Sequence, residues 1–81
     1  MQNILKHISI NLQICHGKPC IKGHRVMVWQ ILDLLEAGYS FDEIIHDHFP
    51  TITKENIQAC IHYANVIIHN EEIHLYENSR K

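Results

Sequence analysis

The sequence predicts a mainly α-helical domain in which a short β element precedes three helices. Apolar residues alternate with polar ones near the N-terminus, and from residue 28 onward they recur at helical spacing. The length of 81 residues indicates one domain with a thin hydrophobic core, which favours association with a partner or a second copy. We expect a strand and β-hairpin in residues 1–27, a three-helix bundle in residues 28–70 and a flexible C-terminal arm in residues 71–81.

The N-terminal strand is predicted near residues 7–11, or onward to residue 14. Four apolar side chains alternate with polar ones, as in a half-buried strand: Ile8, Ile10, Leu12 and Ile14. Residues 20–28 then fit a tight hairpin in which Gly23 adopts a positive φ angle. A lone hairpin is marginally stable in water, so its edges must be covered by the preceding strand or by another subunit.

The first two helices are indicated by their spacing and their end signals. From Val28 the apolar residues follow the i, i+3, i+4, i+7 pattern, and Gly38 stands where a helix often ends in a left-handed residue. A second helix is predicted from about residue 41 to 48, because Ser40 and Glu43 have the spacing of a capping box. Its inward face is expected to consist of Phe41, Ile44, Ile45 and His48.

A third helix is predicted to begin near Thr53, after Pro50 has ended the second. One apolar stripe consists of Ile57, Ile61, Ala64 and Ile68, widened by Cys60 and Ile67. A second set lies off this stripe and consists of Ala59, Tyr63 and Val66. Because the helix is apolar over more than the usual arc, we expect it to have neighbours on two sides. The last two helices have the outline of a helix-turn-helix.

Charge is distributed unevenly along the chain. Residues 1–32 contain four cations and no acid, which gives a net charge of +4: Lys6, Lys18, Lys22 and Arg25. Residues 33–81 contain three cations and nine acids, which gives a net charge of −6. We expect the basic half to attract either the acidic half or an anionic partner.

Composition excludes several classes of protein. No apolar run approaches the roughly 20 residues that span a bilayer, and the first residues lack a signal-peptide pattern, so we expect a cytoplasmic protein. The three cysteines are expected to be free thiols rather than a disulfide framework. No nucleophile, base and orienting group stand out together, so we do not expect an enzyme.

Residues 8–64 resemble a small bacterial family, domain of unknown function 433. The most specific part of the resemblance is GKPCIKGHRV at residues 17–26, followed at fitting spacing by LLEAGYSFDEI and FPTITKENI. The resemblance implies a homeodomain-like fold whose N-terminal strands pair subunits into a homodimer or a higher homo-oligomer. This chain departs from the family pattern at four positions, where it has Leu12, His16, His24 and Met27 in place of a usual proline, glycine, threonine and proline.

The resemblance also implies a function. Members are described as VapB-like antitoxins and are often encoded beside a PIN-like nuclease, which implies a protein that neutralises this toxin by protein–protein binding and regulates its own operon. The alternative is a stand-alone helix-turn-helix transcriptional regulator that binds operator DNA.

Partner or dimer contacts are expected at the β element and at one residue of the third helix: Ile8, Ile10, Lys18, Pro19, Ile21, Lys22, Arg25 and Tyr63. In the alternative interpretation the turn is structural, and Arg25 takes part in an internal hydrogen-bond network.

DNA contacts, in turn, would come from the third helix: Lys54, Asn56, Gln58, His62 and Asn65. The alternative is that these are solvated helix positions. Residues 41–69 contain one cation and four acids, a net charge of −3, which opposes the approach of phosphates.

A zinc site is the remaining hypothesis for the β element. Cys15, Cys20 and His24, with His16, supply thiolate and imidazole ligands within ten residues. Their spacing matches no familiar zinc motif, so no metal or other cofactor is predicted. The eight histidines also leave open a response to pH near neutrality.

Overall fold

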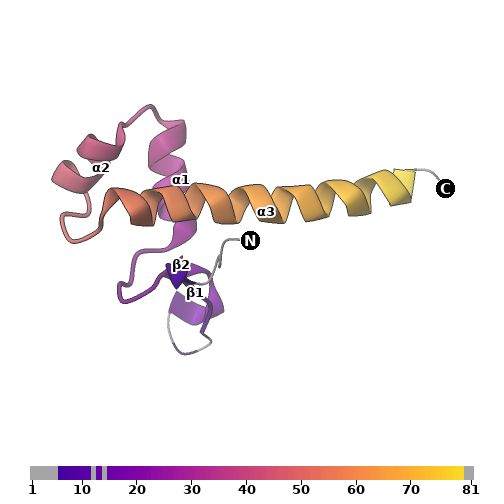
Figure 1. The fold of residues 1–81 in the computed structure, drawn as a ribbon, viewed down its shortest axis with the longest axis horizontal. Coiled ribbons are helices and arrows are strands. Elements are labelled where there is room, and N and C mark those ends of the chain that lie inside the picture. The colour runs from indigo at the N-terminus through magenta and orange to yellow at the C-terminus, as the bar shows by residue number, and fades with distance from the viewer. Residues whose placement is uncertain (1–5, 12, 14, 80–81) are drawn as a thin grey trace.

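The computed structural model describes residues 6–11, 13 and 15–79, and it contains three helices and a two-stranded antiparallel hairpin (Figure 1). The prediction of a mainly α-helical chain with an N-terminal β element is thereby confirmed. No helix among the described residues has the length and apolar character needed to cross a membrane. The elements in chain order are β1 (Ile8–Ser9), the 3-10 turn η2 (Cys15–Gly17), β2 (Cys20–Ile21), α1 (Val28–Glu36), α2 (Phe41–Asp47) and α3 (Lys54–Ser79).

The β element is closed by the preceding strand, which is one of the two alternatives that the sequence left open. β1 pairs with β2 so that Ile8 lies opposite Ile21, and both side chains are fully buried. Gly23 has a φ of 83°, as predicted, and the Ile21 N–H donates to the Val26 carbonyl at 2.8 Å across the turn. The predicted second arm of this hairpin is reduced to a single bridge between Cys20 and Met27.

The first strand is shorter than the alternation of apolar residues predicts. β1 ends at Ser9, and the Ile10 side chain is 55% exposed because it lies beyond the paired residues. The Asn11 Oδ1 accepts a hydrogen bond from the Gln13 N–H at 2.8 Å, a local turn that competes with strand extension. Leu12 and Ile14, which were also expected in this strand, lie outside the described residues.

The predicted signals at the ends of α1 and α2 are present. Gly38 has a φ of 101° just after α1, and its N–H donates to the Leu35 carbonyl at 3.0 Å. The Tyr39 N–H donates to the Leu34 carbonyl at 3.1 Å, which completes a Schellman motif. At the start of α2, Ser40 and Glu43 form the reciprocal capping box, with distances of 2.8 and 3.1 Å.

The core is made mainly of isoleucine side chains, with at least one from each strand and each helix. Each helix packs against the other two, and α3 also contacts β1. The prediction that His48 faces the core is wrong. His48 is exposed, because α2 ends at Asp47 and His48 itself leaves the helical conformation. Its ring instead packs edge-on against Tyr39, with ring centroids 5.0 Å apart. The buried apolar residues are Ile8, Cys20, Ile21, Val26, Val28, Ile31, Ile44, Ile52, Ile57 and Cys60.

α3 is longer than the core that it packs on. Its 26 residues span about 39 Å at 1.5 Å per residue, and Figure 1 shows its C-terminal half extending past the other elements. Ile57 and Cys60 are fully buried, whereas Ile68, predicted on the same stripe, is 55% exposed because the core has ended by that point. The helix continues through residues 71–79, where the sequence predicted a C-terminal arm.

Cys60 gives the folded state a dependence on alkaline pH. Burial raises the pKa of its thiol from 9.0 to about 12. Above about pH 9 the unfolded thiol loses its proton while the buried thiol keeps it, so the unfolded state binds fewer protons and stability falls as pH rises. We expect the free energy of unfolding to decline by up to about 1 kcal/mol per pH unit from this group between about pH 9 and 12.

Urea unfolding at about pH 8 and about pH 10.5 measures this decline. The matched variant is Cys60→Ala, in which the alkaline decline should be smaller by the contribution of one thiol. An equal decline in both proteins would contradict the assignment to Cys60.

Candidate partner-binding site

A hollow of about 270 Å³ lies on the β element and brings together several of the residues singled out in the sequence. It is lined by Ser9, Cys20, Gly23, His24 and Arg25. These residues come from both strands and from the turn that follows β2, so the pairing of β1 with β2 assembles the hollow. The GKPCIKGHRV motif therefore forms one side of a small depression open to solvent.

Backbone hydrogen bonds hold the turn beneath the hollow. The His24 N–H donates to the Ile21 carbonyl at 3.0 Å, and the Lys22 N–H donates to the His7 carbonyl at 2.7 Å. The His24 ring also reaches the loop before α3, with its Nδ1 3.3 Å from the Thr51 hydroxyl. The turn is thus fixed at both ends, and Arg25 projects from a defined backbone position.

Arg25 is free to bind a ligand. Its side chain is exposed, and within the described residues it forms neither a hydrogen bond nor an ion pair. A guanidinium presents donors in a planar fork that matches the two oxygens of a carboxylate. The guanidinium in the lining of the hollow can therefore bind the carboxylate of an acidic side chain.

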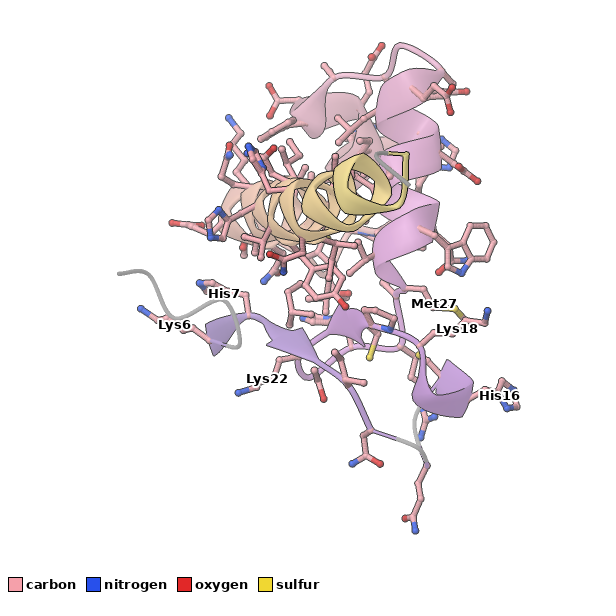
Figure 2. All side chains as sticks on the ribbon, turned by 90° about the vertical axis from the view of Figure 1, so that its right-hand side faces the viewer. Lys6, His7, His16, Lys18, Lys22 and Met27 are labelled. Carbon is pink, nitrogen blue, oxygen red and sulfur yellow. The ribbon has the colours of Figure 1, made fainter. Side chains whose placement is uncertain are left out.

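The other cations of the basic half are also exposed. None of Lys6, Lys18 and Lys22 forms an ion pair in the part of the chain that the structure describes. Figure 2, which looks along α3 from its C-terminal end, shows Lys6 and Lys22 on one side of the β element and Lys18 on the other. The sequence allowed an attraction between the basic half and the acidic half of the chain. Among the described residues, these three lysines form no ion pair with an acid of residues 33–81.

The buried thiol of Cys20 is protonated at neutral pH. Burial of Cys20, which is 1% exposed, raises its pKa, and a hydrogen bond with Cys15 adds to the effect while Arg25 opposes it. Zinc binds the thiolate and not the thiol. Over residues 6–11, 13 and 15–70, no three His, Cys, Asp or Glu side chains cluster closely enough to hold a metal. All three cysteines, including Cys60, are free.

A second concave surface lies between α1 and the middle of α3. It is an apolar groove of about 310 Å³, which we call the α1/α3 groove. Trp29 in its wall is 50% exposed, which is a large apolar side chain left in water. The lining includes Lys18, Pro19, Trp29, Leu32, Tyr63 and Ile68.

The predicted partner contacts are therefore divided among three places. Ile8 and Ile21 lie in the core, whereas Ile10 is exposed. Arg25 lines the hollow, and Lys22 lies in the turn beside it. The remaining three line the α1/α3 groove: Lys18, Pro19 and Tyr63.

Sequence reasoning missed Trp29 as a surface residue. Trp29 is the single tryptophan of the chain, and it lies off the apolar stripe of α1. Its position off this stripe is the sequence signal that could have identified it as a surface residue. Its indole N–H donates to the Met27 sulfur at 2.9 Å.

The residues predicted to read DNA are not equivalent in the structure. Gln58 and Asn65 are exposed, and His62 is half-buried. Lys54 pairs with Asp42 at 3.2 Å. Asn56 is only 8% exposed, and it caps α3 through its Oδ1, which accepts from the Thr53 N–H at 2.9 Å.

Replacing Asn56 tests whether this side chain caps α3 or is a solvated position available for DNA. The Asn56 N–H also donates to the Thr53 hydroxyl at 3.2 Å, so the two residues cap the helix reciprocally. We expect Asn56→Ala to lower the free energy of unfolding by about 1–2 kcal/mol, because it leaves cap donors without partners. Gln58→Ala should change it by less than about 0.5 kcal/mol. Urea unfolding of both variants measures the difference, and equal stabilities would contradict the capping role.

Comparison with known proteins places the chain in a family. Residues 8–64, more than half of the chain, match the family described as "Protein of unknown function (DUF433)", and the chain belongs to it. The structure is similar to a crystal structure at 2.00 Å resolution of a DUF433 member from Anabaena variabilis ATCC 29413, with a TM-score of 0.70 and 23% identity. The match covers 90% of this chain and 72% of that one, and it shows a shared fold. No match is found among curated proteins.

Proposed function

We propose that the protein is the antitoxin of a type II toxin–antitoxin pair, which neutralises a PIN-like nuclease by protein–protein binding and regulates its own operon. The observation that supports this function best is the open hollow on the β element, lined by Arg25, which forms no ion pair with the residues that the structure describes. The proposal takes the class of partner from the family resemblance and the mode of binding from the charge and shape of this element.

An acidic protein surface suits this element. The four cations of residues 1–32 are exposed without nearby acids in the sequence. The partner that the family resemblance implies is a nuclease with an acidic metal site. Complementary charge accelerates encounter and selects the partner, and a guanidinium–carboxylate pair fixes its orientation. Arg25 would bind a carboxylate of the nuclease, and Lys22 beside it would add to the attraction.

The alternative function is that of a stand-alone transcriptional regulator with a homeodomain-like, helix-turn-helix core. Gln58 and Asn65 on the exposed side of α3 favour it, because amides can bind base edges in the major groove. Against it, residues 41–69 carry a net charge of −3, and Asn56 is occupied in capping α3. Phosphate contacts would have to come from the β element, which would give a strong salt dependence of affinity.

Co-purification with the product of the adjacent gene tests the proposal. The two proteins are co-expressed with an affinity tag on the neighbour only, and the eluate is examined for this chain. We expect a stable complex that dissociates as salt is raised, because the contact is charge-driven. A tagged neighbour that elutes alone, together with a free protein that shifts its own promoter DNA, would establish the regulator instead.

A further inference from the structure

The α1/α3 groove and the hollow that contains Arg25 have no lining residue in common. It is apolar, it is open, and it contains Trp29, which is 50% exposed. Ile68 in the same lining is 55% exposed. An apolar surface of this kind on a small domain indicates a protein interface.

We propose that a second copy of this chain docks in the α1/α3 groove and forms a two-fold dimer through α1 and α3. This interface shares no lining residue with the hollow that contains Arg25, and it does not depend on the antitoxin function.

The shape of the surface supports a second copy as the occupant. A two-fold interface uses the same patch on both subunits, so the patch must contain both a depression and a projection. Here Trp29 and Tyr63 line the depression together with Ile67 and Ile68, and these two isoleucine side chains are 37% and 55% exposed. In a two-fold arrangement the isoleucines of each copy enter the depression of the other.

The length of α3 supports the same occupant. Beyond the core the helix continues to Ser79, and Figure 1 shows no other element beside this half. Most helical stability in proteins comes from packing an apolar face, and a short isolated helix is marginal in water. Pairing two copies across the groove supplies that packing to both helices at once.

Charge determines the direction in which the two helices cross. Lys18 lines the groove, and the sequence places Glu71 and Glu72 one turn beyond Ile67 and Ile68. Residues 70–79 contain three acids and neither Lys nor Arg. Antiparallel crossing brings the acidic segment of each copy toward Lys18 of the other. Parallel crossing would place the two acidic segments side by side, which is repulsive.

Two isoleucine substitutions test the interface. Ile68 and Ile10 are equally exposed, at 55%, but the first lies in the groove and the second on the β element. We expect the wild type to sediment as a dimer and Ile68→Glu to weaken dimerisation by about 30-fold or more, because it places a carboxylate in an apolar interface. Ile10→Glu should leave the dimer intact. The reverse result, or a wild-type monomer, would overturn the proposal.

The single tryptophan provides an independent measurement on the unmodified chain. Trp29 is covered in the proposed dimer and exposed in the monomer, so its fluorescence emission should shift to longer wavelength on dilution, in step with dissociation. In Ile68→Glu the emission should already be at long wavelength without dilution. Emission that stays constant while the wild-type dimer dissociates would place the interface elsewhere.

A charge exchange tests the antiparallel crossing. Lys18→Glu should weaken the dimer, and the added pair Glu71→Lys and Glu72→Lys should restore it, because the complementary signs are then exchanged between the subunits. If the triple variant is as weak as the single variant, the antiparallel contact is wrong.

Discussion

Replacing Ile31 by alanine is expected to lower the free energy of unfolding by about 2–4 kcal/mol, the largest stability effect among the changes considered. Ile31 lies in the middle of α1, is fully buried and belongs to the cluster that joins all three helices to the β element. The substitution removes three carbon atoms and leaves a cavity that a small core cannot close fully. Because small domains have only a few kcal/mol of net stability, this loss should bring the protein close to unfolding.

The matched control is Ile10→Ala, which removes the same atoms from a side chain that is 55% exposed. It should change the free energy of unfolding by no more than about 0.5 kcal/mol. Urea unfolding followed by circular dichroism measures both variants at one protein concentration, since the proposed dimer would make stability depend on concentration. Equal losses in the two variants would contradict the position of the core described above.

Reversing two charges beside the hollow should abolish neutralisation of the nuclease. In the double variant Lys22→Glu, Arg25→Glu, the affinity for the nuclease should fall by at least about 100-fold, because carboxylates then face the acidic partner. Both side chains are exposed, so the fold and the dimer should survive. Inhibition of RNase activity by increasing amounts of each protein measures the loss.

Lys54→Glu is the control for that experiment. Lys54 is an exposed cation at the start of α3, it does not line the hollow, and its ion pair with Asp42 lies in solvent. An exposed ion pair contributes little to stability, and its loss should leave neutralisation unchanged. If Lys54→Glu impairs neutralisation as much as the double variant does, the contact does not centre on the hollow.

Local signals in the sequence predicted much of the fold. The helix ends at Gly38 and Ser40 follow from backbone hydrogen bonds within a few residues, and the structure contains both. The positive φ at Gly23 has the same local origin. The same kind of local conformation shows why glycine is usual at position 16: His16, which stands in its place, has a φ of 57°, a conformation that glycine adopts most easily.

Features that depend on where the core ends could not be predicted in this way. Ile10 and Ile68 continue periodic patterns in the sequence, yet both are exposed because the elements they belong to extend past their packing partners. Asn56 has an amide side chain of the kind that reads DNA bases. It caps α3 instead, because Thr53 lies three residues before it and the two residues exchange hydrogen bonds. Periodicity gives the direction of a side chain, and only tertiary structure shows what lies in that direction.

The candidate site was predicted in part. The sequence indicated the GKPCIKGHRV motif and its cations as contacts, and Arg25 lies in an open hollow. It did not separate this hollow from the α1/α3 groove, since Lys18 and Lys22 are four residues apart and yet lie on opposite sides of the β element (Figure 2).

Titrating the RNase activity of the adjacent gene product with the purified wild-type protein tests the proposed function most directly. A neutralising antitoxin should remove the activity at a fixed, stoichiometric ratio and in the absence of DNA. RNase activity that persists in the presence of a large excess of the folded protein would contradict that function.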